Sequence, residues 1–348
     1  MPRLLIDGLF LTKEVNGIPR YVRELLRCLD VAPHAFDAEV LVPGGGEVRD
    51  LPRYRTMSIS RVGKHTGQRW EQLELPRAMR SRRGVGLYPC NTSPVLAPGI
   101  TVIHDISPVV NPGFYSPVNA RYHQVLFSLT IPRARLILTV SEFSKREIER
   151  VYPAVRGKVE VVPCAWQHME RVVADLGILE RLGLVPGKYF FALSTLSPNK
   201  NLRWIVETAR RNPDYTFVVA GGMDPRVFGE HGIPQTGNVI YPGFVSDGEA
   251  KALMSECRGF LFPTFYEGFG MPPLEALSCG APIAVSDTEV MHEVYGSSAR
   301  YLDPRVPCDD VEALFGSPVD DPGDTLGRFS WDISACRFAD AVGRCLAC

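Results

Sequence analysis

Residues 264–279 read TFYEGFGMPPLEALSC, and this stretch predicts the fold around it. It follows the apolar residues 259–262, which predict a buried strand, and then changes at once to a glycine loop. Pro272 and Pro273 are tolerated at the start of a helix, because the first amide N–H groups have no partner there. The stretch therefore predicts strand, glycine loop and helix N-terminus, an arrangement that favours an anion such as a phosphate.

Two carboxylates flank this predicted anion site. Glu267 lies on the loop, and Glu275 lies one turn inside the helix. Carboxylates repel phosphates, so they are better suited to hydroxyl groups of the same ligand. A diphosphate with hydroxyl-rich groups at both ends is a nucleotide-sugar. The alternative is that Glu267 is a turn residue and Glu275 a solvated helix residue.

Composition narrows the class of protein. A chain of 348 residues is too long for one ordinary core and predicts two domains. A hydrophobic content of 45% and a charged content of 22% are typical of soluble globular proteins. The net charge of −1 excludes bulk polybasic binding to nucleic acid. No apolar run approaches the roughly 18 residues of a membrane span.

The cysteines indicate a reducing compartment. There are nine, they form no regular framework, and no charged-then-apolar leader opens the chain. We therefore expect reduced thiols in the cytosol. Cys345 and Cys348 form a C-x-x-C without a second pair, so we interpret them as incidental thiols.

The first half of the chain alternates strands and helices. Strands are predicted at 3–10, 38–43, 84–90 and 100–108, and a helix at 114–134. Gly17 lies in the loop between the first strand and a helical pattern. The fourth strand ends in His104 and Asp105, at the edge where open α/β sheets bind their ligands; the alternative is a structural histidine. Ser144 and Glu147 have capping-box spacing, with Ser141 as a second candidate cap.

The alternation restarts at Lys188, which predicts a second doubly wound unit. Strands are predicted at 188–196, 215–222, 238–247 and 281–287. Ser246 and Glu249 have capping-box spacing before the helical pattern 247–257. Between the two halves, Trp166, Gln167 and His168 either line a cleft or pack the linker.

The spacing of Glu267 and Glu275, with GFGMPPL between them, resembles the E-x7-E signature of retaining GT4 glycosyltransferases. The resemblance covers nearly the whole chain. It implies an α/β GT-B fold, with two Rossmann-like doubly wound parallel-sheet domains facing across a cleft. The implied parts are an acceptor-side domain at 1–165, a linker at 166–187, a nucleotide-sugar-binding domain at 188–325 and a C-terminal helix at 326–348 that returns to the first domain.

The resemblance also implies roles for single residues. His104, Glu267 and Lys200 match the catalytic positions: His104 and Glu267 would hold the donor sugar, and Lys200 its diphosphate. Glu275 would hold the ribose. Asn199 stands where many relatives carry Arg, so Lys200 is expected to be the principal basic clamp. The other implied donor-binding positions are Gly17, Thr195, Asn199, Gly243, Phe244, Val245, Gly268, Phe269, Gly270, Met271 and Leu274.

The implied activity is retaining, metal-independent hexosyl transfer without a cofactor, in bacterial polysaccharide synthesis. The expected donor is GDP-mannose or dTDP-rhamnose, and the expected acceptor is a hydroxyl of a glycan or lipid-linked saccharide. Two alternatives stay open: a GT-B sugar-nucleotide 2-epimerase and a non-catalytic GT-B regulatory subunit.

The expected location is the cytoplasm, with no nucleic-acid partner. The segment 61–83 carries Trp70 and several basic residues, which allows peripheral contact with the inner face of a membrane. The alternative is a solvated helix face whose charges are partly balanced by Glu71 and Glu74.

Overall fold

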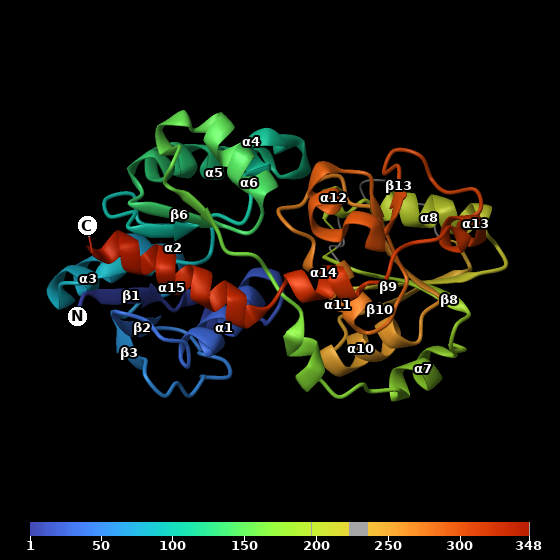
Figure 1. The fold of residues 1–348 in the computed structure, drawn as a ribbon, viewed down its shortest axis with the longest axis horizontal. Helices are drawn as coiled ribbons and strands as arrows, with labels where there is room; N and C mark the ends of the chain where they lie inside the picture. The colour runs from blue at the N-terminus through green and yellow to red at the C-terminus, as the bar shows by residue number, and fades with distance from the viewer. Residues whose placement is uncertain (196, 223–235, 348) are drawn as a thin grey trace. The chain divides into compact units, whose positions relative to one another are not determined.

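The computed structural model describes residues 1–195, 197–222 and 236–347. They form two compact units, each built on a parallel sheet with helices packed against it (Figure 1). The first unit consists of Met1–Cys164 and the described residues from Ser330 onward, and the second consists of Ala165–Phe329. This confirms the predicted α/β class with two doubly wound sheets.

The segment 166–187, which was predicted to be a linker, is part of the second unit. Its carbonyl groups hold it there, because the Lys251 ammonium donates to the carbonyls of Met169 at 2.7 Å and Val172 at 2.9 Å. The Asp175 amide also donates to the Gly248 carbonyl at 2.9 Å. The segment therefore packs as part of a folded unit.

The first unit has a seven-stranded sheet in the order β3-β2-β1-β4-β5-β6-β7. All paired strands are parallel, and chain order reverses direction between β1 and β4, which makes that junction the topological switch point. The strands are β1 (Arg3–Asp7), β2 (Asp37–Pro43), β3 (Ser58–Val62), β4 (Val85–Tyr88), β5 (Ile100–Val102), β6 (Leu136–Thr139) and β7 (Val159–Val161).

Helices cover this sheet. The last helix of the chain lies beside the first one, where the rings of Tyr21 and Trp331 meet edge to face at 5.8 Å (Figure 1). The helices are α1 (Gly17–Leu29), α2 (Gly67–Arg69), α3 (Leu75–Arg82), α4 (Ser107–Val110), α5 (Pro117–Thr130), α6 (Glu142–Val151) and α15 (Trp331–Ala347), with a π-helical turn at Trp70–Glu74. Single 3-10 turns lie at Leu9–Thr12, Pro112–Phe114, Ile131–Arg133 and Pro153–Val155.

The second unit has a six-stranded parallel sheet in the order β10-β9-β8-β11-β12-β13, with its switch point between β8 and β11. Its strands are β8 (Tyr189–Leu193), β9 (Thr216–Ala220), β10 (Val239–Gly243), β11 (Gly259–Phe262), β12 (Ile283–Ser286) and β13 (Arg300–Leu302). Its α-helices are α7 (Gly177–Leu182), α8 (Leu202–Arg211), α10 (Asp247–Ser255), α11 (Met271–Ser278), α12 (Glu289–Tyr295), α13 (Val311–Gly316) and α14 (Gly323–Arg328). Its 3-10 turns lie at Gln167–Arg171, Pro198–Lys200 and Gly296–Ser298.

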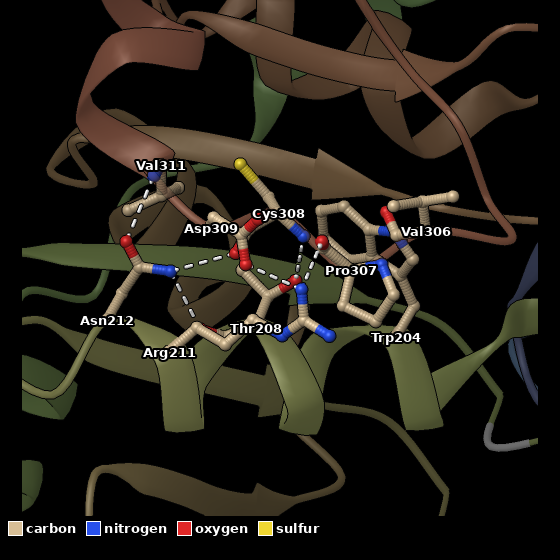
Figure 2. Close-up of polar contacts among 9 residues, drawn as sticks. All are labelled: Trp204, Thr208, Arg211, Asn212, Val306, Pro307, Cys308, Asp309 and Val311. Carbon is tan, nitrogen blue, oxygen red and sulfur yellow. Dashed lines mark hydrogen bonds and ion pairs between the residues drawn. The ribbon is translucent and has the colours of Figure 1, made fainter.

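The chain that leaves β13 is fastened along α8 by side-chain hydrogen bonds (Figure 2). The Trp204 indole donates to the carbonyls of Asp303 at 3.0 Å and Val306 at 2.8 Å. Further along, Thr208 accepts from the Cys308 amide, and Asn212 accepts from the Val311 amide while donating to the Cys308 carbonyl. These bonds satisfy backbone groups of the loop and hold the loop against α8.

Several local predictions differ from the structure; for example, the strands predicted at 3–10 and 238–247 end at Asp7 and Gly243. The strand predicted at 100–108 ends at Val102, and a short helix begins at Ser107, because Pro108 fits the first turn of a helix. The cap of α6 is Ser141, whose hydroxyl accepts from the Ser144 amide, whereas the Ser144 hydroxyl donates to the His104 carbonyl. The capping box of Ser246 and Glu249 is confirmed.

Candidate active site

Two loops meet at the switch point of the second sheet. One follows β8 and comprises residues 194, 195 and 197–201, and the other follows β11 and spans 263–270. We call them the switch-point loops. Because β8 and β11 are parallel neighbours, their carboxyl ends lie at the same edge, which is where open α/β sheets bind ligands.

An ion pair joins the switch-point loops. The Lys200 ammonium lies 2.6 Å from Oε1 of Glu267, with 19% and 13% of the two side chains exposed. The ammonium also lies 5.6 Å from the centre of the Phe262 ring, within cation–π range. The structure thus places a compact cation and a carboxylate side by side. Such a pair can meet a ligand that carries both phosphate and hydroxyl groups.

Asn199 holds the two loops together through its backbone and side chain. Its carbonyl accepts from the Phe265 amide at 2.8 Å, and its Oδ1 accepts from the Ser197 hydroxyl at 2.6 Å. Thr195 is exposed on the same loop, with its hydroxyl 3.5 Å from that of Ser197. Asn199 therefore acts in the structure as a loop anchor, and Thr195 is accessible to a ligand.

Gly270 forms the corner between the glycine loop and α11. Its φ of +87° lies in the left-handed region, and a Cβ there would come within 2.7 Å of the Met291 methyl group. The Tyr295 hydroxyl donates to its carbonyl. Pro272 and Pro273 follow in the first turn of α11 and carry no N–H. An anion at this helix start would therefore meet the amides of residues 268–271.

Three implied donor-binding side chains of the glycine loop and α11 lie in the core. Phe269, Met271 and Leu274 are all buried, and the Phe269 ring packs edge to face against Phe329 at 5.2 Å. Their side chains shape the loop, so a ligand would meet their backbone. Gly268 is buried at the same turn.

Glu275 is not a solvated helix residue. It is buried, and its Oε1 lies 2.9 Å from Nε2 of His168. His168 belongs to the segment 166–168, for which the sequence left two interpretations open: lining a cleft or packing the linker. Its neighbours pack within the second unit, since Trp166 donates to the Leu326 carbonyl and Gln167 to the Phe329 carbonyl. Sequence reasoning did not pair His168 with Glu275.

The loop after β10 contributes an exposed ring. Gly243 has a φ of +77° with open space around it, and its carbonyl accepts from the Gly221 amide at 2.9 Å. Phe244 follows with 67% of its surface exposed, and Val245 is buried. An exposed aromatic side chain at a sheet edge can stack on a planar base, whereas Val245 supports the turn.

In the first unit, His104 lies just beyond β5, as predicted. Its Nε2 donates to the Pro89 carbonyl at 3.1 Å, and its ring meets the Tyr21 ring edge to face at 4.9 Å. Burial lowers the pKa of His104 to about 4, so the imidazole is neutral near pH 7. Gly17 begins α1 with a φ of +34° and with open space around it. Both residues lie within the first unit.

Two buried carboxylates at the switch point of the first sheet were missed. Asp7 ends β1 and Glu71 lies in the π-helical turn, and both are almost fully buried. Burial raises the pKa of Asp7 well above its usual range, with a further rise from the charge of Glu71, and burial also raises the pKa of Glu71. Sequence reasoning missed Asp7 because it continued the first strand to residue 10, past the observed end of β1 at Asp7.

The alternative of a solvated helix face at 61–83 is therefore only partly correct. Glu71 is buried and accepts from the Thr92 hydroxyl at 2.7 Å. Trp70 is also fully buried, and its indole donates to the Val62 carbonyl at 2.8 Å. These two residues hold the segment against the sheet. Arg69, Arg77 and Arg80 are exposed. Among the described residues, no helix has both the length and the hydropathy needed to span a membrane.

Comparison with known proteins gives a family match within the second unit. Residues 181–302 match the family described as Glycosyl transferases group 1, and this range contains both switch-point loops and α11. The chain is 29% identical to O-antigen chain mannosyltransferase B of Escherichia coli over 86% of this chain and 85% of that protein. It is 26% identical to the O-antigen chain mannosyltransferase RfbU of Salmonella typhimurium over 62% of this chain and 59% of that protein.

Solved structures support the fold. HepE from Anabaena, determined in complex with UDP and glucose, superposes with a TM-score of 0.67 at 15% identity and covers 98% of this chain and 99% of its own. WaaG, a glycosyltransferase involved in lipopolysaccharide biosynthesis, superposes with a TM-score of 0.62 at 13% identity and covers 97% of this chain and 95% of its own. The chain is thus a glycosyltransferase with the GT-B fold, and its residues 181–302 match the Glycosyl transferases group 1 family.

Proposed function

We propose that this enzyme moves mannose from GDP-mannose to a hydroxyl of a glycan or lipid-linked saccharide, with retention of anomeric configuration. The relatives that cover most of the chain bear the name mannosyltransferase, which favours mannose over rhamnose from dTDP-rhamnose. Because those relatives act on O-antigen chains by name, the proposed pathway is surface polysaccharide synthesis in the cytoplasm.

The observation that carries this proposal is the Lys200–Glu267 pair beside the start of α11. A donor diphosphate would take Lys200 as counterion and would accept hydrogen bonds from the amides of residues 268–271. Glu267, released from that ion pair, would accept hydrogen bonds from hydroxyls of the sugar. Glu275 would do the same for the ribose. Thr195 and the Gly243–Val245 turn complete the proposed donor contacts of the second unit.

The chemical step depends on stabilising the leaving group. Departure of the nucleotide diphosphate produces the largest charge change, so Lys200 and the helix start supply the main catalytic effect. We assign no enzymic nucleophile: the acceptor hydroxyl forms the new glycosidic bond on the face that the diphosphate leaves, and the departing phosphate takes the hydroxyl proton. The sequence has no D-x-D motif at a strand end, which supports a reaction without a metal ion.

The lipid-linked form of the acceptor would be met at a membrane surface. Six exposed apolar side chains lie on three connected segments of the first unit, with exposed fractions from 39% for Leu129 to 87% for Leu96. We call this the lipid-facing surface; it comprises Leu73, Leu96, Val118, Tyr122, Val125 and Leu129.

Hydrogen bonds connect the segments of the lipid-facing surface. The Tyr122 hydroxyl donates to Gln68 at 2.7 Å, and the Val95 amide donates to Gln72 at 3.0 Å. Four of the six residues form a stripe along α5, which contains no acidic residue and carries the exposed Arg121. Apolar side chains bordered by cations suit the headgroup region of an anionic bilayer.

Co-sedimentation with vesicles tests the membrane contact. The chain should bind phosphatidylcholine vesicles containing phosphatidylglycerol more strongly than pure phosphatidylcholine. The triple variant Val118→Ser, Val125→Ser, Leu129→Ser should lose this binding, because it removes most of the apolar stripe. The control substitutes Val173, Leu176 and Val185 of the second unit by serine; these side chains are also exposed, by 86%, 54% and 60%. Equal binding by both variants would contradict the assignment.

One reaction of the full chain tests both the proposed donor and the proposed retention of anomeric configuration. GDP-mannose and an acceptor glycan of the O-antigen type should give an α-mannoside, because GDP-mannose carries an α-linked sugar and retention preserves it. The anomeric proton in an NMR spectrum of the product checks this. Conversion of the donor without acceptor would indicate an epimerase, and a β-mannoside would contradict retention.

A further inference from the structure

The segment 165–171 packs within the second unit through a series of polar side chains. Trp166 and Gln167 donate to backbone carbonyls near the end of that unit. His168 instead reaches a side chain, with its Nε2 2.9 Å from Oε1 of Glu275. This contact therefore involves a proposed donor-binding residue.

The His168–Glu275 contact is buried. Only 2% of the His168 side chain and 9% of the Glu275 side chain are exposed. A carboxylate away from water needs a hydrogen-bond donor, and here Nε2–H of His168 supplies one. More of Glu275 than of His168 remains accessible. A ligand at this site would therefore touch the carboxylate and not the imidazole.

The position of Glu275 in the fold explains what its contact with His168 can do. Glu275 lies in α11, whose N-terminus carries the proposed diphosphate site, so its backbone is placed relative to the phosphates. Its side chain has three rotatable bonds and would otherwise sample several rotamers. A hydrogen bond from His168 selects one of them. The Glu275 carboxylate is then held in place before a ligand arrives.

We propose that His168 is a positioning residue: it holds Oε1 of Glu275 so that the carboxylate is ready to accept hydrogen bonds from the 2′ and 3′ hydroxyls of the donor ribose. This inference rests on the proposed function, in which Glu275 binds the ribose. The positioning role has a chemical consequence. A ribonucleotide offers two hydroxyls to the fixed Glu275 carboxylate, whereas a 2′-deoxyribonucleotide offers one. The site should therefore bind ribonucleotides more tightly.

Binding of GDP and of 2′-deoxy-GDP to the full chain tests this inference. Titration calorimetry of the wild-type chain should give a lower Kd for GDP. His168→Phe keeps a planar ring but donates no hydrogen bond. It should raise the Kd for GDP by about tenfold, the loss expected for one charge-assisted hydrogen bond, and reduce the preference over 2′-deoxy-GDP. His168→Gln restores a hydrogen-bond donor, so it should recover most of the affinity for GDP and most of the preference for GDP over 2′-deoxy-GDP.

Kinetics separate positioning from packing. With GDP-mannose as donor, His168→Phe should raise KM more than it lowers kcat, because the sugar and diphosphate contacts remain. If His168→Phe does not fold, His168→Asn serves instead, since its shorter amide cannot reach Glu275. A folded His168→Phe or His168→Asn protein with wild-type preference for GDP over 2′-deoxy-GDP would overturn the inference.

Glu275→Gln distinguishes this failure from failure of the proposed function. If Glu275→Gln weakens GDP binding while the His168 variants do not, only the positioning role is wrong. If Glu275→Gln binds GDP and 2′-deoxy-GDP as the wild type does, the ribose assignment itself is wrong, and the role of His168 falls with it.

Discussion

Lys200 is the residue whose chemistry matters most in the proposed reaction. Its ammonium is already next to Glu267 at 2.6 Å, and both side chains are largely shielded from water. Lys200→Met should lower kcat/KM for GDP-mannose by about 100-fold or more, because one charge that stabilises the leaving group is removed. Steady-state kinetics measure the effect. Lys188→Met is the matched control, since Lys188 is exposed on the same unit, and it should keep wild-type activity.

Asp7 gives a prediction about pH and stability. Its pKa is raised in the folded state by burial, so folding favours the protonated carboxyl. The stabilisation is complete below the unfolded pKa of about 4 and is lost as pH rises through the folded value. Asp7→Asn stays neutral and keeps an oxygen for the Leu9 amide. Between pH 5 and pH 8, its melting temperature should therefore fall less than that of the wild type.

Thermal melts of Asp37→Asn provide the control for this comparison. Asp37 is exposed at the start of the neighbouring strand β2. Its variant should follow the wild-type pH dependence. Parallel curves for Asp7→Asn and the wild type across pH 5–8 would show that Asp7 is not the titrating group.

At the scale of single residues, sequence reasoning found positions better than it found partners. It placed Glu267 and Glu275 near one helix start, because the spacing of glycines and prolines is a local signal, whereas the role of Lys200 came from the family resemblance. It did not find the partner of Glu275, since His168 lies 107 residues away in the chain. It also treated Glu71 as a surface charge, although that residue is buried. Burial depends on tertiary packing, which a local pattern does not contain.

At the scale of elements, α11 and its glycine corner are the most constrained part of the candidate site. Gly270→Ala should be destabilised by the left-handed backbone, which costs about 1–2 kcal/mol, and by overlap with Met291, which adds about 1–3 kcal/mol. Gly280→Ala is the matched control, because Gly280 at the other end of α11 has a φ of +84° but no atom near its Cβ position. It should show only the backbone cost.

Chemical denaturation of both variants measures these costs. The Gly270 variant should also bind GDP-mannose more weakly, because the amides of the loop would shift. Equal free energies of unfolding for the two variants would contradict the crowding of Gly270 by Met291.

Element boundaries show where local pattern fails. The apolar run at 100–108 predicted one strand, but only Ile100–Val102 pairs in the sheet. Beyond Val102 the His104 amide bonds to the Asn91 side chain and no longer to a neighbouring strand. The α6 cap lies at Ser141 because its extended backbone fits an N-cap, whereas Ser144 is already helical. In both cases the residue types were compatible with either reading, and three-dimensional contacts decided between them.

At the scale of the whole molecule, alternation of strands and helices was enough to predict two doubly wound units. The sheet orders add what the sequence could not give, namely the switch points between β1 and β4 and between β8 and β11. The second switch point brings the loops after β8 and β11 together, so Lys200 and Glu267 meet although they lie 67 residues apart. The chain order of strands therefore explains why the candidate site lies on that edge.

Equilibrium titration of the full chain with GDP-mannose, beside the Glu267→Gln variant, tests the central claim most directly. We expect saturable binding by the wild type. The variant should bind GDP almost as well but lose most of the added affinity for GDP-mannose, because Glu267 would contact the sugar. Equal affinity of the two proteins for GDP-mannose, or no saturable binding of GDP-mannose or dTDP-rhamnose by the wild type, would contradict the account.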